Sequence, residues 1–144
     1  MRLLFRSLSR SLSLNPSLGL AIGLWALCAL DPAAALADKS YTAETQITHD
    51  CDKDGDVSIN VSRATAVLTG TCAKVSINGS ENKVTIAAVK KLKVNGAKNT
   101  VDITAADEIS ATGVGNTVTY KKSLTGKKTA VKSPGVDNKI SEIK

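Results

Sequence analysis

Apolar residues alternate with polar ones along most of the chain after residue 56, in short runs that glycine and asparagine separate. The runs KVSI at 74–77, KVTI at 83–86 and TVDI at 100–103 each place an apolar side chain at every second position. Period-two alternation is typical of β-strands with one buried face, whereas an amphipathic helix has a period of about 3.6. We therefore predict an all-β fold.

A Gly-x-x-Asn-x-Val motif repeats along these runs. Its glycines follow one another at steps of 17, 17 and 22 residues, at Gly79, Gly96, Gly113 and Gly135. Its asparagines come three residues later, at Asn82, Asn99, Asn116 and Asn138. Two residues beyond each asparagine lies an aliphatic residue, at Val84, Val101, Val118 and Ile140. A fainter copy, VSIN at 57–60, has Val61 where the glycine would be.

If each repeat forms one coil, residues at the same distance from the motif glycine lie above one another in columns. We therefore predict a small parallel β-solenoid of about five coils, with a period of about 17 residues, in which Val84, Val101 and Val118 form one buried column. An antiparallel array of hairpins would also give short, regularly spaced strands. Nothing in such an array requires the same corner residue every 17 positions.

The first 37 residues have the features of a secretory signal peptide. Arg2, Arg6 and Arg10 precede an apolar core of 13 residues at 18–30, and AAALA at 33–37 is typical of a cleavage site. A membrane-spanning helix needs about 20 apolar residues, so no transmembrane segment is expected after cleavage before Asp38. The protein is then exported and is periplasmic or extracellular.

The remaining residues, 38–144, are predicted to form a single domain. Within it we expect a polar lead-in and N-terminal cap at 38–56 and regular coils at 57–120. The longer step of 22 predicts a basic inserted loop at 121–132, after which 133–144 closes the last coil. Tyr41 and Tyr120 are the only aromatic residues after position 37, so the core is expected to be narrow and aliphatic.

Cys51 and Cys72 are the two cysteines of residues 38–144. In an oxidising compartment an even pair most simply forms one disulfide. Metal ligation is the alternative, but there is no CxxC motif and His49 is the single histidine. We predict a Cys51–Cys72 disulfide.

Three segments together resemble a known family: LTGTCAKVSINGSENKVTI at 68–86, LKVNGAKNTVDI at 92–103 and ISATGVGNTVTYKKS at 109–123. They are similar to the secreted bacterial family catalogued as domain of unknown function 3060, in which a cysteine precedes Gly-x-x-Asn-x-Val repeats. The resemblance covers about residues 51–143. It implies a small β-helix-like fold in the envelope or outside the cell, and it implies no activity. The chain departs from the pattern at Val61 and at 121–132.

The segment DCDKDGD at 50–56 matches the first half of a calcium-binding loop. Asp50, Asp52 and Asp54 could converge on one cation, with Gly55 allowing the sharp turn. The bidentate glutamate expected at loop position twelve is replaced by Val61. The alternative is an acidic, solvated turn beside the disulfide.

Residues for catalysis are sparse, and we predict no catalytic residue and no enzyme. His49 beside Asp50 is the only histidine, and we expect it to be exposed near the cap. Asp102, Asp107 and Glu108 could supply the carboxylate pair of a glycosidase. Asp102 lies between two inward-facing residues, however, so its side chain should point outward into solvent.

Lysines are concentrated in the predicted inserted loop. Those at Lys121, Lys122, Lys127 and Lys128 suit an anionic envelope surface, with improved solubility as the alternative. Nucleic-acid binding is not expected, because only Tyr120 is near for stacking and the protein is exported. Lys90, Lys91 and Lys93 are expected to cover an outer strand face.

The sequence thus favours a secreted, non-enzymatic β-solenoid that acts as a structural or binding module at the bacterial cell envelope. No cofactor is predicted apart from the calcium considered for Asp50, Asp52 and Asp54. Two alternatives stay open, which are an envelope glycan hydrolase and a calcium-dependent adhesion module.

Overall fold

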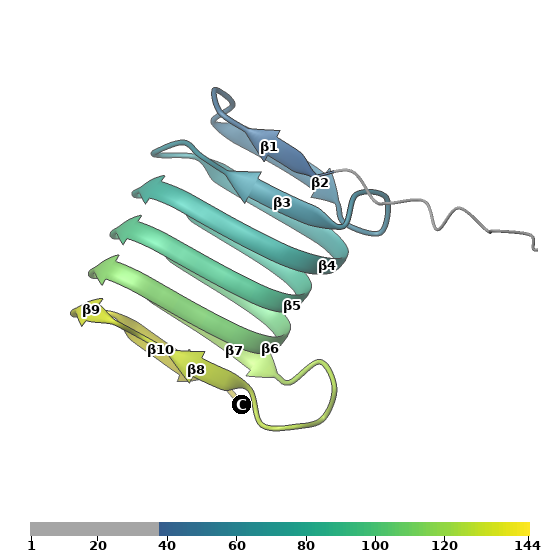
Figure 1. The fold of residues 1–144 in the computed structure, drawn as a ribbon, viewed down its shortest axis with the longest axis vertical. Helices are drawn as coiled ribbons and strands as arrows, with labels where there is room; N and C mark the ends of the chain where they lie inside the picture. Colours follow the sequence, from purple (N-terminus) through teal and green to yellow (C-terminus); the bar gives the residue numbers. More distant parts are fainter. Residues whose placement is uncertain (1–37) are drawn as a thin grey trace, which may run out of the picture. The chain divides into compact units, whose positions relative to one another are not determined.

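The computed structural model describes residues 38–144, and the predicted signal peptide at 1–37 lies outside the described residues. Ten strands follow one another without a helix in this part of the chain (Figure 1). They are β1 (Lys39–Tyr41), β2 (Gln46–Asp50), β3 (Asp56–Ile59), β4 (Thr65–Ser80), β5 (Lys83–Ala97), β6 (Thr100–Val114), β7 (Thr117–Lys122), β8 (Ala130–Lys132), β9 (Gly135–Val136) and β10 (Lys139–Glu142). No helix that is long and apolar enough to cross a membrane occurs among residues 38–144.

Every strand pair is parallel, and the strands wind into a flattened coil with two faces (Figure 1). The long strands β4, β5 and β6 each bend once, so that their first halves lie on one face and their second halves on the other. The first face runs from β2 through these first halves to β7 and β10. The second runs from β1 and β3 to β8 and β9. The predicted parallel β-solenoid is therefore confirmed.

The coils from β5 to β7 stack in the predicted register of 17 residues. Val84 pairs with Val101, and Val101 pairs with Val118. All three side chains are fully buried and form one column, as predicted. Ile77, Val94 and Ala111 form a second buried column on the opposite face. Fully burying a valine contributes about 1.5–3 kcal/mol, so the repeated columns are the main apolar stabilisation of the stack.

The motif asparagines form a buried ladder at the corner where one face passes into the other. The Nδ2 of Asn82 donates to Oδ1 of Asn99 at 3.0 Å, and the Nδ2 of Asn99 donates to Oδ1 of Asn116 at 2.9 Å. Each Oδ1 also accepts the backbone N–H of the preceding asparagine, at 3.1 Å in both cases. The second Nδ2 hydrogen of Asn99 reaches the carbonyl oxygen of Gly79 at 2.9 Å. Asn116 and Asn138 repeat the pattern.

The motif glycines are required by the close approach of successive coils. A Cβ added to Gly96 would lie 1.9 Å from the carbonyl oxygen of Gly79, and a Cβ on Gly113 would lie 2.0 Å from that of Gly96. Both glycines have positive φ, 136° and 112°, which side-chain-bearing residues rarely adopt. Val61 is tolerated because the register between β1 and β3 ends at Tyr41–Ile59, before its position.

The segment at 38–56, expected as a lead-in and cap, is the first coil of the stack. Strand β1 pairs with β3 and β2 pairs with β4, both in parallel register. Ile47 lies in the same column as Ala66 and Val84, and it is buried. Tyr41 in this coil and Tyr120 near the other end are each only 9% exposed. The two aromatic rings therefore cover opposite ends of the aliphatic core.

The predicted insertion lies between β7 and β8, within the expected range 121–132. Two residues lie between Ala105 and Glu108 in β6, whereas seven lie between their register partners Lys122 and Ala130, an excess of five. Residues 123–129 project as a loop (Figure 1). The chain then returns to the stack through β9 and β10, which pair with β6 and β7.

The buried column predicts the effect of a charge at its centre. Val101→Asp would bury an unpaired carboxylate and should lower the free energy of unfolding by several kcal/mol, which is comparable to the stability of a small domain. Denaturant unfolding followed by circular dichroism measures this. Thr100→Asp adds the same charge at the neighbouring exposed position and should change stability by less than about 0.5 kcal/mol. Equal stability of the two variants would contradict the column.

Candidate functional site

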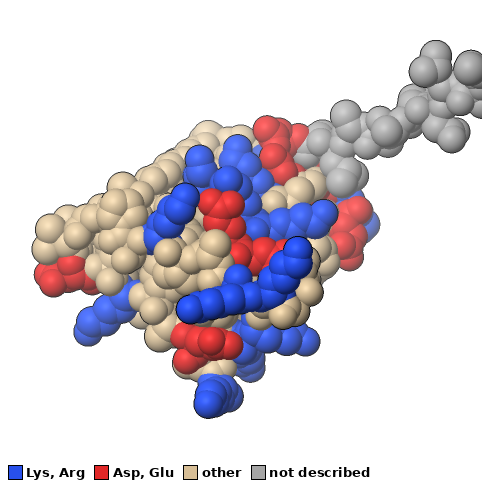
Figure 2. Space-filling model, turned by 60° about the horizontal axis from the view of Figure 1, so that its bottom comes forward, with Lys and Arg blue, Asp and Glu red and all other residues tan. Residues whose placement is uncertain are grey.

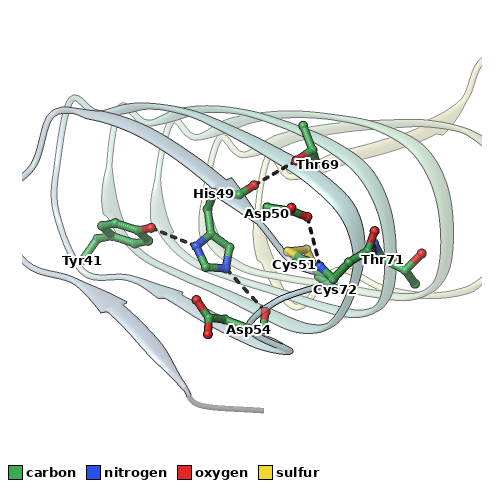
Figure 3. The surroundings of a disulfide bond; sticks show 9 residues. Tyr41, His49, Asp50, Cys51, Asp54, Thr69, Thr71 and Cys72 are labelled. Carbon is green, nitrogen blue, oxygen red and sulfur yellow. Dashed lines mark hydrogen bonds between the residues drawn. A yellow bond between two sulfur atoms is a disulfide. The ribbon is translucent and has the colours of Figure 1, made fainter.

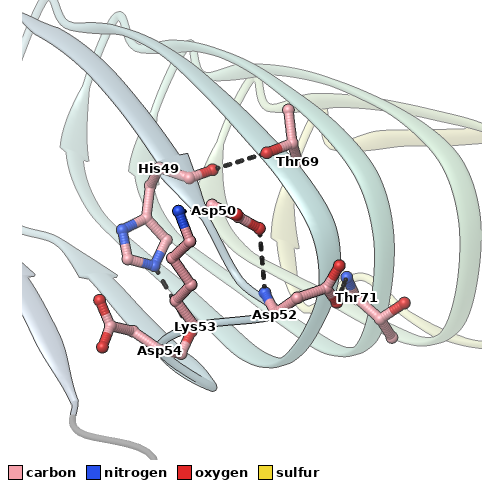
Figure 4. Close-up of polar contacts among 7 residues, drawn as sticks. All are labelled: His49, Asp50, Asp52, Lys53, Asp54, Thr69 and Thr71. Atoms are coloured by element: carbon pink, nitrogen blue, oxygen red, sulfur yellow. Dashed lines mark hydrogen bonds and ion pairs between the residues drawn. The ribbon is translucent and has the colours of Figure 1, made fainter.

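The acidic turn at 50–56 is held to the second coil by the carboxylate of Asp52 (Figure 4). Oδ1 of Asp52 accepts the backbone N–H of Thr71 at 2.9 Å, and its carboxylate fills the space beside Gly70. Asp50 accepts the backbone N–H of Asp52 at 3.2 Å and lies 3.5 Å from the ammonium of Lys53. These contacts fix the shape of the turn.

The three aspartates considered for calcium do not form a ligand cage. Asp50 and Asp52 are directed to separate partners, and Asp54 lies on the side of His49 (Figure 4). Within residues 38–144 no group of three or more histidine, cysteine, aspartate or glutamate side chains is placed so that it could hold a metal ion. In this structure the segment forms an acidic turn beside the disulfide, and calcium binding by the three aspartates stays a prediction.

Cys51 and Cys72 form the predicted disulfide (Figure 3). Their Cα atoms are 4.8 Å apart, and both residues are buried. The backbone N–H of Cys51 also donates to the carbonyl oxygen of Thr69 at 2.9 Å. The bond therefore ties the acidic turn of the first coil to the bend of β4 in the second.

His49 was expected to be exposed, and this expectation is wrong. It occupies a core position in register with Leu68 and is only 7% exposed (Figure 3). Its Nε2 lies 3.4 Å from the carbonyl oxygen of Asp54, which can only accept, and its Nδ1 lies 3.0 Å from the hydroxyl of Tyr41. Nε2 then carries the proton and Nδ1 accepts from the tyrosine. The pKa of Tyr41 is raised above its ordinary value. Burial is the largest cause, followed by the negative charges of Glu44 and Asp54.

The carboxylates considered for a glycosidase each have a different partner. Asp102 accepts a hydrogen bond from the hydroxyl of Thr119 on the outer face of the sheet. Glu108 forms an ion pair with Lys91, with 3.0 Å between Oε2 and Nζ. Asp107 binds the inserted loop. The lysines at 90 and 93 are exposed, as expected for an outer strand face.

Asp107 organises the base of the inserted loop. Its Oδ1 accepts the backbone N–H of Thr125 at 2.9 Å, the hydroxyl of Thr125 at 3.0 Å and the hydroxyl of Ser123 at 3.1 Å. Desolvation acts to raise the pKa of Asp107, but these hydrogen bonds together outweigh it and lower that pKa. At the far end of the loop Thr129 donates to the carbonyl oxygen of Ala106 at 2.8 Å. The loop is thus fastened to β6 at both ends.

A hollow of about 470 Å³ opens at the C-terminal end of the solenoid, beside this loop. Its lining combines the ring of Tyr120, three lysines and one carboxylate, and consists of Tyr120, Lys122, Ser123, Gly126, Lys127, Lys128, Thr129 and Glu142. Figure 2 turns this end forward and shows lysine side chains over much of it. Three of the four lysines predicted for anion binding therefore line one hollow.

A smaller hollow of about 230 Å³ lies on the outer face near the same end. It is lined by Thr85, Asp102, Ile103, Thr104, Thr119, Lys121 and Ile143. The fourth predicted lysine, Lys121, is thus directed to the second hollow. Each of the two hollows contains a single carboxylate, Glu142 in the first and Asp102 in the second.

Several lining residues of the larger hollow could not be identified from the sequence. Glu142 pairs in register with Tyr120 and replaces the apolar residue of that column, so the break in the repeat at the last copy was the available signal. Ser123 and Thr129 carry no signal of their own, because their places depend on contacts of the folded loop with the Asp107 carboxylate and the Ala106 carbonyl oxygen.

A family model described as "Protein of unknown function (DUF3060)" matches residues 59–107 and 88–124. The match confirms, over residues 59–124, the family resemblance given by the repeats. Searches of curated proteins and of solved structures found no significant match.

The disulfide should be complete in the native protein and should contribute to its stability. Peptide mapping without reduction should recover Cys51 and Cys72 as one linked pair that becomes alkylated only after reduction. Removing the bond with Cys51→Ser and Cys72→Ser should lower the free energy of unfolding by about 3 kcal/mol, because the 21-residue separation closes a sizeable loop in the unfolded chain. Two free thiols in the unreduced protein would contradict the assignment.

Proposed function

We propose that this protein is an exported, non-enzymatic binding module of the bacterial cell envelope, whose basic C-terminal end holds an anionic envelope polymer. The observation that carries the proposal is the larger hollow, which combines Lys122, Lys127 and Lys128 with the ring of Tyr120. Lysine ammonium groups are compact donors for carboxylate or phosphate oxygens.

The regular coils support this location for the site. Their inward positions are filled by aliphatic side chains that are fully buried, such as Val84 and Val101. Ligand space is therefore restricted to the outer faces and the ends of the stack, where the repeat is interrupted. The inserted loop is the largest such interruption in residues 57–144, and proteins built from repeats often bind through insertions of this kind.

The carboxylate arrangement supports a binding module in preference to a glycan hydrolase. Glycoside hydrolysis generally uses two carboxyl groups that flank the scissile bond. Each of the two hollows is lined by one carboxylate, and Asp107 and Glu108 are engaged with the loop and with Lys91. Export is proposed from the features of residues 1–37, which lie outside the described residues.

Neutralising the four lysines predicted for anion binding tests the proposal. The variant Lys121→Gln/Lys122→Gln/Lys127→Gln/Lys128→Gln should be retained at least about tenfold less than wild type on anionic envelope fractions at low salt. Wild-type retention should fall in 1 M salt, where the Debye length is about 3 Å. Co-sedimentation with isolated envelopes measures both effects.

A matched variant controls for net charge. Lys83→Gln/Lys90→Gln/Lys93→Gln/Lys98→Gln removes the same charge from exposed positions on the middle coils and should bind like wild type. If both variants lose retention equally, net charge and not the loop is responsible. Equal retention of the loop variant and wild type, without salt dependence, would rule the binding proposal out.

A further inference from the structure

The two ends of the solenoid carry opposite net charge. The first coil, residues 38–56, contains six carboxylates and two lysines, net −4: Asp38, Glu44, Asp50, Asp52, Asp54 and Asp56 against Lys39 and Lys53. Residues 121–144 at the other end contain seven lysines and two carboxylates, net +5: Lys121, Lys122, Lys127, Lys128, Lys132, Lys139 and Lys144 against Asp137 and Glu142. The molecule is therefore polar along its stacking axis.

The acidic turn and the basic loop lie at the same bend of the coil, opposite the asparagine corner. In the register of the sheet Asp56 lies above Lys74, followed by Lys91, Glu108 and Ala130. The turn before Asp56 and the loop before Ala130 are thus the first and last members of one column of bends. Figure 1 shows both on the side where the long strands β4, β5 and β6 bend. A copy added end to end would place its acidic turn against the basic loop.

The strand order allows such an addition. In the described chain β1 and β2 pair on one side only, with β3 and β4, while β8, β9 and β10 pair only with β6 and β7. One face ends with β8 and β9 and begins with β1, and the other ends with β10 and begins with β2. Ile140 and Ile47 occupy the last and first positions of the same inward column. The first coil of a second copy can therefore continue both faces in parallel register.

The end strands also limit pairing that is not guided by charge. Strands β1 and β8 have three residues each and β9 has two. Lys39 lies in β1, Lys132 in β8 and Lys139 in β10, and Pro134 directly precedes β9. Short edges that carry lysine and proline disfavour unspecific strand addition. Complementary charge at the bend then decides which edge a partner meets.

We propose that copies of this chain associate head to tail, with the basic C-terminal end of one copy on the acidic N-terminal end of the next. The contact joins two different surfaces, so it does not close on itself and gives open linear assemblies. The inference goes beyond the proposed function, although both use the C-terminal lysines. A second copy and an anionic polymer would compete for that end, and only self-association uses the acidic turn.

Sedimentation velocity of the purified chain over a range of concentrations tests the proposal. In 0.01 M salt, where the Debye length is about 30 Å, the average mass should rise continuously with concentration beyond that of a dimer. In 1 M salt, with a Debye length of about 3 Å, it should return to the monomer mass. A monomer at every concentration in low salt would overturn the proposal, as would a closed dimer that salt does not dissociate.

Charge-reversal variants assign the association to the two ends. Asp54→Lys/Asp56→Lys changes carboxylates that accept none of the hydrogen bonds described above, and Lys127→Glu/Lys128→Glu changes the basic loop. Each variant alone should remain monomeric in low salt, and an equal mixture of the two should regain the high-mass species. The control Lys90→Glu/Lys93→Glu, on the side of the stack, should associate like wild type. Association of either end variant alone, or a mixture that stays monomeric, would refute head-to-tail contact.

One variant separates this inference from the proposed function. Asp54→Lys/Asp56→Lys should lose self-association while its retention on anionic envelope fractions is unchanged or higher. Loss of self-association with retained envelope binding supports the stacking contact independently. If that variant still assembles, stacking through the acidic turn is wrong, whatever the envelope assay gives.

Discussion

The buried asparagine ladder at the Gly-x-x-Asn corner is the interaction on which the stack depends. A coil that turns a corner inside a protein leaves backbone N–H and C=O groups that must find partners. Here the side-chain amide of Asn99 serves both directions, since its Oδ1 accepts from Asn82 while its Nδ2 donates to Asn116 and to the carbonyl oxygen of Gly79. No buried side-chain nitrogen or oxygen within residues 38–144 is left without a partner. Asn82, Asn99 and Asn116 each donate to an asparagine of the next coil, which holds successive corners in register even across the longer step to Asn138.

This constraint also determines where the molecule can vary. In the middle coils the register repeats every 17 residues, and each motif glycine lies close to the carbonyl of the preceding one. The buried aliphatic columns fill the interior. Departures from the period are possible only at the bend opposite the corner and at the two ends. The acidic turn at 50–56 and the loop at 123–129 are departures of this kind. The turn carries four of the six carboxylates of the first coil, and the loop carries two of the seven lysines of the other end. Both proposals made above therefore rest on the irregular parts of a regular fold.

The repeat made the regular part of this fold predictable. Val84, Val101 and Val118 were assigned to one column because each lies at the same distance from its motif glycine. In a solenoid, residues at equal distances from the motif pair with one another in neighbouring coils. The first coil was not predicted, because its steps to the second coil are 18 and 19 residues and it lacks the motif. His49 was misplaced for the same reason, since its inward position follows from pairing with Leu68. The positive φ values of Glu81 and Lys98 could not be predicted from the sequence either, because neither residue type favours that conformation.

The most direct measurement of the ladder compares two asparagines of the same coil by denaturant unfolding. Asn99→Ala removes the acceptor of two Asn82 donors and the donor to the oxygens of Gly79 and Asn116. These groups lie in or beside the core, and each buried group left unpaired costs about 1–3 kcal/mol. Asn95→Ala removes an exposed hydrogen bond to Asn78, whose partner can turn to water. The account predicts a loss of several kcal/mol for Asn99→Ala and of about 1 kcal/mol or less for Asn95→Ala. Equal losses for the two variants would contradict it.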